Sequence, residues 1–241
     1  MLFRYTIKMK TAEDYLSGQV LLIDKPLHWT SFQAVNKLRW EIRQAFSIKK
    51  IKVGHAGTLD PLATGLLVIC TGKMTKQIDT FQGQIKEYTG TIVLGSTTPS
   101  FDLETEINET FETNHITEDL IHNTTKQFTG EIEQFPPIFS AIKKEGKRLY
   151  EFARAGETVE IKSRKITIEV FEITKIDGNN LDFRVVCSKG TYIRSLANDF
   201  GKAMHSGSHL SALRRTKIGD FNVSNALSID NFIEALPKKE Q

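Results

Sequence analysis

Three glycines, a histidine and an aspartate lie within one twelve-residue segment, Gly54–Gly65 (GHAGTLDPLATG). Glycine adopts positive φ angles and lets a ligand approach the backbone closely. The carboxylate of Asp60 in such a loop can act as a nucleophile or as a general base. Asp before Pro is also typical of a helix start, with Asp60 as the N-cap and Pro61 as the first helical residue. From these residues alone the capping role is the commoner one, and both interpretations stay open.

Motifs of several other enzyme classes do not occur in the sequence. GxGxxG is absent, and Gly72-Lys73 lacks the earlier glycine of a phosphate-binding loop because Leu67 occupies that position. No Cys/His cluster has zinc spacing, and no GxSxG nucleophile elbow is present. Cys70 and Cys187 lie in apolar, strand-like runs, so we expect buried, reduced thiols. Chemistry without a metal or a cofactor is the remaining possibility.

The charge is unevenly distributed, although the net charge is only +3. Residues 1–83 carry 12 basic and 6 acidic side chains, and residues 84–142 carry 2 and 10. Residues 143–217 carry 16 basic and 9 acidic side chains, and the tail 218–241 carries 2 and 4. Two basic blocks therefore flank an acidic one. This pattern fits a groove for a polyanion, and it equally fits scattered surface charge.

The elements that must position these residues mix helices and strands without strict alternation. One helix has Phe32, Val35, Leu38, Ile42 and Phe46 at helical spacing, with Lys37, Arg39 and Arg43 toward solvent and Thr30 or Ser31 as its cap. The predicted elements, in chain order, are strands at 19–24, 66–70 and 86–94, a helix at 117–128, an extended run at 135–140, a basic loop at 143–148, a helix at 149–155, paired strands at 166–176 and 181–187, and a helix at 191–204. The fold class is α+β, with a mixed, mostly antiparallel sheet flanked by helices.

We expect one catalytic domain over 1–241, with a core at about 19–218 and a short tail at 219–241. No apolar run reaches the roughly 18 residues that span a bilayer. Met1–Gln19 lacks the apolar region of a signal peptide. These features predict a cytoplasmic protein without a membrane partner.

The Gly54–Gly65 segment closely resembles the catalytic motif of TruB-type pseudouridine synthases, in which the aspartate of the G-x-LDP-x-ATG pattern is the nucleophile. Further matches follow in the order of the family. They are Leu22-Ile23-Asp24-Lys25-Pro26 with Thr30-Ser31, Lys86-Glu87-Tyr88, Ser140-Ala141-Ile142-Lys143 with Gly146-Lys147-Arg148-Leu149-Tyr150, Ser188-Lys189-Gly190-Thr191-Tyr192-Ile193-Arg194-Ser195-Leu196, and Leu213-Arg214-Arg215. The resemblance covers about residues 19–218. It implies an isomerase that converts the T-loop uridine of tRNA, position 55, to pseudouridine.

The resemblance also implies roles for individual residues. Asp60 is the catalytic carboxylate, acting at C1′ or C6 or as the base that starts loss of the C2′ proton. Arg194 pairs with Asp60, since a guanidinium stays charged and binds both carboxylate oxygens. Tyr88 is the candidate ring that stacks on the flipped base, and removal of the C5 proton is a second candidate role, for its hydroxyl. His55 is a candidate to fill or support the vacated stack. Lys25 binds phosphate or orients the catalytic loop.

RNA binding is expected mainly from a basic, aromatic thumb segment at about 135–156. The RNA-contacting residues that the resemblance implies are Lys143, Lys147, Arg148, Tyr150, Lys189, Arg214 and Arg215. Only 26 residues follow Arg215, too few for the C-terminal PUA domain of many relatives. We therefore expect a short form without that domain. In the stretch 95–104, Asp102 is the aspartate that matches the acidic loop of the family.

Two other functions remain as alternatives. The chain could be an RNA-binding module whose main role does not need Asp60, or a guide-RNA-dependent synthase. Guided relatives act with protein partners and usually with the PUA domain, whose expected absence argues against this alternative. We therefore expect no guide RNA and action on the T arm of tRNA, and a monomer is the default expectation.

Overall fold

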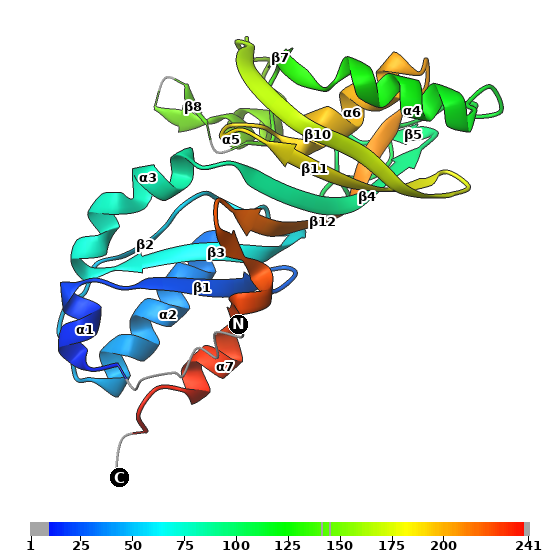
Figure 1. The fold of residues 1–241 in the computed structure, drawn as a ribbon. Helices are drawn as coiled ribbons and strands as arrows, with labels where there is room; N and C mark the ends of the chain where they lie inside the picture. The colour runs from blue at the N-terminus through cyan, green and yellow to red at the C-terminus, as the bar shows by residue number, and fades with distance from the viewer. Residues whose placement is uncertain (1–9, 141, 145, 239–241) are drawn as a thin grey trace, which may run out of the picture. The chain divides into compact units, whose positions relative to one another are not determined.

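The computed structural model describes residues 10–140, 142–144 and 146–238 (Figure 1). Ala141 of the predicted thumb, the first nine residues of Met1–Gln19 and the last three of the tail lie outside the described residues. The chain divides into two compact units. The terminal unit comprises Met1–Gln84 and Arg214–Gln241, and the central unit comprises Ile85–Leu213.

The terminal unit has a sheet built on two antiparallel strands, with Leu22 opposite Val68 and Lys25 opposite Gly65. Its strands, in spatial order, are β14 (Leu227–Ser228), β1 (Val20–Lys25), β3 (Ala63–Thr71) and the end of β12 (Ser208–Ile218), with β2 (Val53–His55) beside β3 and β13 (Phe221–Asn222) beside β12. β14 runs parallel to β1, which makes this sheet mixed. Its helices are α1 (Ala12–Ser17), α2 (Ser31–Ala45), α3 (Ile78–Gly83) and α7 (Ile229–Glu234), with 3₁₀ turns at Gly72–Gln77 and Val223–Asn225.

Both faces of β3 are covered, because successive strand residues point to opposite sides. Leu67 and Ile69 belong to the core under α2 and α7. Leu66 and Val68 belong to a second core, against which Ile78 and Phe81 of the α3 region pack. Figure 1 shows α2 and α7 on one side of the strands β1 and β3. This two-sided burial explains why β3 appears in the sequence as a continuous apolar run.

Helix α2 begins as its sequence predicts. The Thr30 hydroxyl accepts a hydrogen bond from the Gln33 amide, and the Gln33 side chain accepts one from the Thr30 amide, which forms a capping box. Phe32 departs from the predicted apolar face and is exposed. Phe32 and Leu38 are six residues apart, so at 3.6 residues per turn their side chains point about 120° apart. Only Leu38 faces the sheet.

The central unit has an antiparallel sheet whose inner strands were predicted closely. Its strands, in spatial order, are the start of β12, β4 (Lys86–Leu94), β11 (Asn180–Cys187), β10 (Arg164–Asp177) and β7 (Gly130–Gln134). The helices are α4 (Glu118–Gln127), α5 (Leu149–Arg154) and α6 (Ile193–Ala203), and two small hairpins pair β5 (Ser96–Thr97) with β6 (Glu109–Thr110) and β8 (Lys143–Lys144) with β9 (Lys147–Arg148). Phe200 of α6 packs edge-on against Phe171 of β10, with 5.1 Å between ring centroids.

The architecture confirms the predicted α+β class with a mixed, mostly antiparallel sheet and flanking helices. Cys70 and Cys187 are buried, as expected from their apolar surroundings. Among the described residues, no helix is long and apolar enough to cross a membrane.

Candidate active site

Asp60 lies in a tight turn that leads directly into β3. The Ala63 amide donates to the Asp60 carbonyl at 3.1 Å, and the His28 amide donates to the Pro61 carbonyl at 2.8 Å. The chain then continues as a strand from Ala63. The helix-cap interpretation of Asp60 is therefore wrong, because the apolar run after the turn pairs with β1 instead of starting a helix.

The start of α2 supports this turn. The Ser31 hydroxyl accepts a hydrogen bond from the Leu59 amide at 2.8 Å and donates one to the Leu59 carbonyl at 3.1 Å. Thr30 caps the helix, which leaves Ser31 to hold the residue before Asp60. Sequence reasoning considered Ser31 as a possible cap and as part of a family motif, but not as a support for the Asp60 turn. Ser31 and Leu59 are 28 residues apart in the sequence, so no local pattern indicated this contact.

Arg215 holds the loop from inside the protein. Its side chain is almost fully buried, with 1% of its surface exposed. The guanidinium donates to the carbonyls of Leu66 at 2.8 Å and Gly57 at 3.0 Å, and to that of Thr58 at 3.4 Å. Arg215 was predicted to contact phosphate. The structure corrects this, because the donors are turned inward onto main-chain oxygens on both sides of Asp60.

Lys25 is also enclosed, with no exposed surface. Its ammonium donates to the carbonyls of Trp29 at 2.6 Å and Pro26 at 2.9 Å. Burial lowers the pKa of this ammonium to about 8, while the charge of Asp60 acts in the opposite direction and that of Arg215 lowers it further. Of the roles left open for Lys25, orienting the loop fits this position, and contact with RNA phosphate does not.

His55 and Arg214 are the remaining residues of the terminal unit that the sequence predicted as part of the site. Burial and the charge of Arg215 lower the pKa of the His55 imidazole, which favours the neutral ring. The Arg214 guanidinium forms a two-pronged contact with the Asp24 carboxylate, at 2.6 and 3.0 Å. Its donors therefore face Asp24, whereas the expectation was a phosphate contact.

In the central unit, Tyr88 lies on β4 opposite Val185 of β11, and its side chain is buried. Gly90 allows the neighbouring strand β12 to approach, because a Cβ there would lie 2.2 Å from the Ala212 carbonyl oxygen. This close packing fixes the strand that carries Tyr88.

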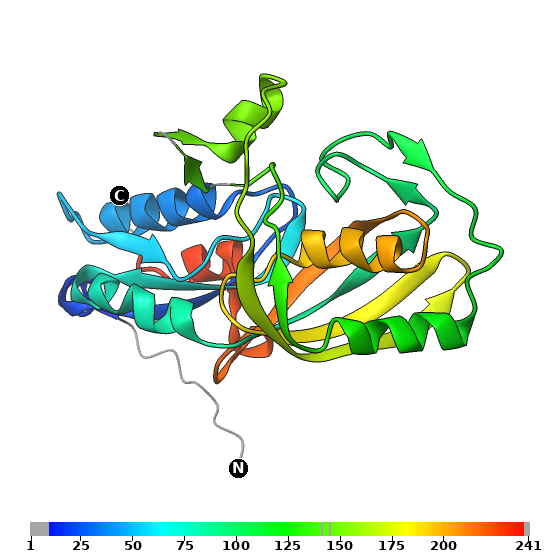
Figure 2. The same ribbon diagram turned by 90° about the horizontal axis from the view of Figure 1, so that it is seen from above.

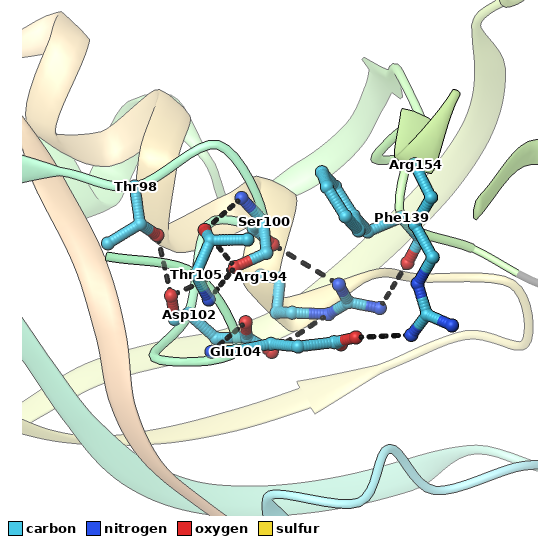
Figure 3. Close-up of polar contacts among 8 residues, drawn as sticks. All are labelled: Thr98, Ser100, Asp102, Glu104, Thr105, Phe139, Arg154 and Arg194. Atoms are coloured by element: carbon cyan, nitrogen blue, oxygen red, sulfur yellow. Dashed lines mark hydrogen bonds and ion pairs between the residues drawn. The ribbon is translucent and has the colours of Figure 1, made fainter. Parts of the chain in front are cut away.

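Arg194 lies in the first turn of α6 and is buried (Figure 3). Its Nε lies 3.6 Å from Oδ2 of Asp102, and its terminal nitrogens donate to the carbonyls of Ser100 at 3.2 Å and Phe139 at 2.9 Å. The Asp102 carboxylate is a partner that sequence reasoning did not assign. It was visible only as one aspartate in the acidic loop.

The loop that presents Asp102 is itself densely hydrogen-bonded. The hydroxyls of Thr98 and Ser100 donate to the Asp102 carbonyl at 2.6 and 3.0 Å, and the Glu104 amide donates to its carboxylate at 3.0 Å. The Glu104 carboxylate reaches Arg154 of α5 at 3.2 Å. One loop thus contacts both Arg194 and the helix of the thumb segment, as Figure 3 shows.

The thumb segment presents alternating cations and rings. Lys143, Lys147 and Arg148 are exposed on its hairpin, as is Lys189 elsewhere in the unit. The Lys147 ammonium lies 5.6 Å from the centroid of the Phe152 ring, and Arg148 and Arg154 lie 5.9 and 5.4 Å from that of Tyr150. Figure 2 shows the hairpin and α5 standing out from the sheet of the central unit.

Two family models together match residues 43–241 of the chain. Residues 43–193 match the model of the TruB family pseudouridylate synthase N-terminal domain. Residues 194–241 match that of the tRNA pseudouridylate synthase B C-terminal domain. The chain belongs to the TruB family. The matched TruB regions contain Asp60 and Tyr88 in the first and Arg194 in the second, and this membership confirms the family resemblance seen in the sequence.

Curated TruB relatives match over nearly their whole length. The chain is 70% identical to the tRNA pseudouridine synthase B of Flavobacterium johnsoniae over 94% of its own length and 99% of the relative. It is 53% identical to that of Phocaeicola vulgatus over 94% and 97%. Among solved structures, a chain of a Cbf5–Nop10–Gar1 complex matches with a TM-score of 0.70 and 29% identity over 93% of this chain. This chain spans about half of that longer one, 56%.

Proposed function

We propose that this chain converts the T-loop uridine of tRNA, position 55, to pseudouridine, with Asp60 as the catalytic carboxylate. The observation that carries the activity is the 70% identity to a curated tRNA pseudouridine synthase B over 94% of the chain. The support for Asp60 is its place in the family motif and in a loop held by buried groups of the same unit.

The reaction breaks the N1–C1′ bond of uridine, turns the uracil and forms a C5–C1′ bond. The hydrogen at C5 leaves and N1 gains one, so no oxidant, reductant or energy source is consumed. A carboxylate starts this sequence by attack at C1′ or C6, or by removing the C2′ proton. Each route needs an aspartate held in a fixed position beside the nucleoside.

The terminal unit provides that fixed position. Ser31 holds the amide and carbonyl of Leu59, and Arg215 holds the carbonyls of Gly57 and Leu66. The Lys25 ammonium interacts favourably with the Asp60 carboxylate through their opposite charges. A loop held from several sides places the carboxylate without the entropy cost of ordering a mobile segment.

The central unit supplies the other proposed groups. Arg194 is the proposed partner of the Asp60 carboxylate, and its side chain is already oriented by Asp102 and two main-chain carbonyls. Tyr88 is the proposed stacking partner of the flipped base. Flipping a base costs a few kcal/mol, and one aromatic stack returns about 1–3 kcal/mol. The exposed cations of the thumb hairpin are proposed to contact the T arm.

The experiment is tritium release from tRNA that carries tritium at C5 of uridine, with the purified chain alone. Asp60→Asn should retain tRNA binding and lose essentially all turnover, because the amide keeps the shape but not the charge or nucleophilicity. Asp220→Asn is the matched control, since Asp220 is an exposed aspartate of the same unit. Asp60→Asn activity within tenfold of wild type, about 1.4 kcal/mol, would remove Asp60 from the chemistry.

The same assay separates the alternatives. Tight tRNA binding by the wild-type chain without tritium release would favour an RNA-binding module. Release that appears only after a guide RNA is added would favour a guided synthase.

A further inference from the structure

Helix α2 carries two large aromatic side chains on its solvent side. Phe32 is 67% exposed and Trp40 is 53% exposed, whereas Val35, Leu38 and Ile42 of the same helix are buried. Scattered exposed apolar residues are ordinary on protein surfaces. Two bulky rings on one helix face, two turns apart, are less common than single exposed apolar residues and suggest a binding surface.

Positively charged and polar side chains lie between the two rings. Residues at i, i+4, i+7, i+8 and i+11 share one helix face. On α2 this outer stripe consists of Phe32, Asn36, Arg39, Trp40 and Arg43. The Arg39 guanidinium donates to the Asn36 side chain. The Lys37 ammonium, which also pairs with Glu41 at 2.7 Å, lies 5.5 Å from the centroid of the Trp40 ring.

The charge around the outer stripe is predominantly positive. Residues 31–52 contain six basic residues and the single acidic residue Glu41, an excess of five positive charges. Lys49, Lys50 and Lys52, which follow the helix, are exposed. A cationic surface with interleaved aromatic rings fits a nucleic acid strand, which offers phosphates and flat bases together. An apolar protein partner would gain nothing from the cations.

The outer stripe begins at the catalytic loop. Ser31, whose hydroxyl holds Leu59 beside Asp60, directly precedes Phe32. From Phe32 to Trp40 the helix rises about 12 Å, at 1.5 Å per residue. This length corresponds to roughly three or four nucleotides of one strand, at about 3.4 Å each.

We propose that the outer stripe of α2 binds the RNA strand that continues from the target nucleotide. Phe32 and Trp40 stack against bases or sugars, and Arg39 and Arg43 contact phosphates. The identity of this RNA as the T arm of tRNA rests on the proposed function, whereas the surface itself rests on the exposure, spacing and charge of α2.

The test measures the affinity of a T-arm hairpin by fluorescence anisotropy, with Asp60→Asn present in every protein so that the RNA stays unmodified. Trp40→Ala and Phe32→Ala should each raise Kd about tenfold, which is within the range for loss of one stack. Trp40→Phe should stay within about threefold, and Trp40→Leu should resemble Trp40→Ala. A ring requirement identifies stacking, because a plain apolar contact would accept leucine.

A second measurement addresses the cations. Replacing Arg39 and Arg43 by Gln together should reduce the slope of log Kd against log salt by about 1.4–1.8, from 0.7–0.9 for each lost phosphate contact. Lys175→Gln is the matched charge control, because Lys175 is an exposed lysine of the β10 hairpin. Leu16→Ala of α1 is the matched apolar control, because Leu16 is also exposed.

Affinities of the Trp40 and Phe32 variants within twofold of Leu16→Ala, with an unchanged salt slope, would overturn the proposal. So would loss of self-association in sedimentation by Trp40→Ala with RNA affinity intact, since the stripe would then bind a second copy. Wild-type tritium release is measured separately. A catalytically inactive chain whose RNA affinity depends on Trp40 would reject the proposed function and keep this surface.

Discussion

Replacing Arg215 by Met tests the idea that a buried guanidinium holds the catalytic loop. The substitution removes the charge and all donors of a side chain that is 1% exposed, while it keeps an apolar stem of similar length. It leaves the carbonyls of Leu66 and Gly57, now bonded at 2.8 and 3.0 Å, and that of Thr58 at 3.4 Å, without their partner.

The magnitude follows from these three contacts. A buried polar group that loses its partner costs about 1–3 kcal/mol. The two short bonds dominate, so the loss of partners costs about 2–6 kcal/mol. Methionine avoids the desolvation cost of the buried guanidinium, which offsets part of this. We therefore expect Arg215→Met to lower the free energy of unfolding by about 2–4 kcal/mol. Arg215→Lys should lose less, because one ammonium keeps the charge and some of the donors.

The assay is urea unfolding followed by tryptophan fluorescence. The chain has two tryptophans, Trp29 and Trp40, and both lie in the terminal unit, so the signal reports the unit that contains Arg215. Arg43→Met is the matched control: Arg43 also donates to a carbonyl, that of Ile48 at 3.3 Å, but at an exposed site. Its loss should stay below about 0.5 kcal/mol. A decrease in the free energy of unfolding below about 1 kcal/mol for Arg215→Met, at an unchanged urea m-value, would refute the idea that Arg215 holds the catalytic loop.

Three further predictions follow from the positions of Lys25, Tyr88 and Arg194. The pKa of Lys25 is about 8 in the folded chain, against about 10.4 when unfolded, so the unfolded state binds more protons between these values. The free energy of unfolding of the wild type should therefore rise with pH over this window. Urea titrations of Lys25→Met should show a smaller rise. Equal slopes of unfolding free energy against pH for the two proteins would contradict the argument that burial lowers the pKa of Lys25. For Tyr88, tritium release retained in Phe but lost in Leu would show that the ring is sufficient, loss in both would implicate the hydroxyl, and full activity in both would exclude the residue from the site. Arg194→Ala should lose more turnover than affinity, with partial rescue by Lys because a point charge cannot replace the guanidinium fork; uniformly weaker RNA binding with intact turnover would instead place Arg194 on the binding surface.

The sequence predicted those strands whose residues show a strand pattern within a short window. The strand predicted at 86–94 is β4 with its observed bounds, and the paired strands predicted at 166–176 and 181–187 form the β10–β11 hairpin. Strand β12 was missed. Its sequence, SHLSALRRTKI, contains three basic residues and no apolar alternation, because Arg215 occupies an interior position as a polar core residue. Pairing with neighbours distant in sequence, which no local window contains, makes it a strand.

The candidate site divides in the same way. Asp60 could be predicted from the glycine spacing and the family resemblance, because both signals lie in the single segment Gly54–Gly65. The roles of Lys25 and Arg215 depend on burial, and a lone cation in a sequence looks like a solvated one. Arg214 and Arg215 illustrate this, because adjacent residues of a strand point to opposite faces. One arginine pairs with Asp24 at a half-exposed position and the other lies in the core.

The buried contacts of Ser31 and Arg215 also explain why Asp60→Asn tests the chemical role of Asp60 separately from its role in the fold. Ser31 and Arg215 hold main-chain atoms of Leu59, Gly57 and Leu66, and these contacts do not involve the carboxylate of Asp60. An amide in place of the carboxylate leaves each of these hydrogen bonds possible. The loop should therefore keep these main-chain contacts when the charge is removed, while the attraction between the carboxylate and the Lys25 ammonium is lost. A loss of turnover with normal unfolding then measures what the carboxylate does to the nucleoside and not what it does to the fold.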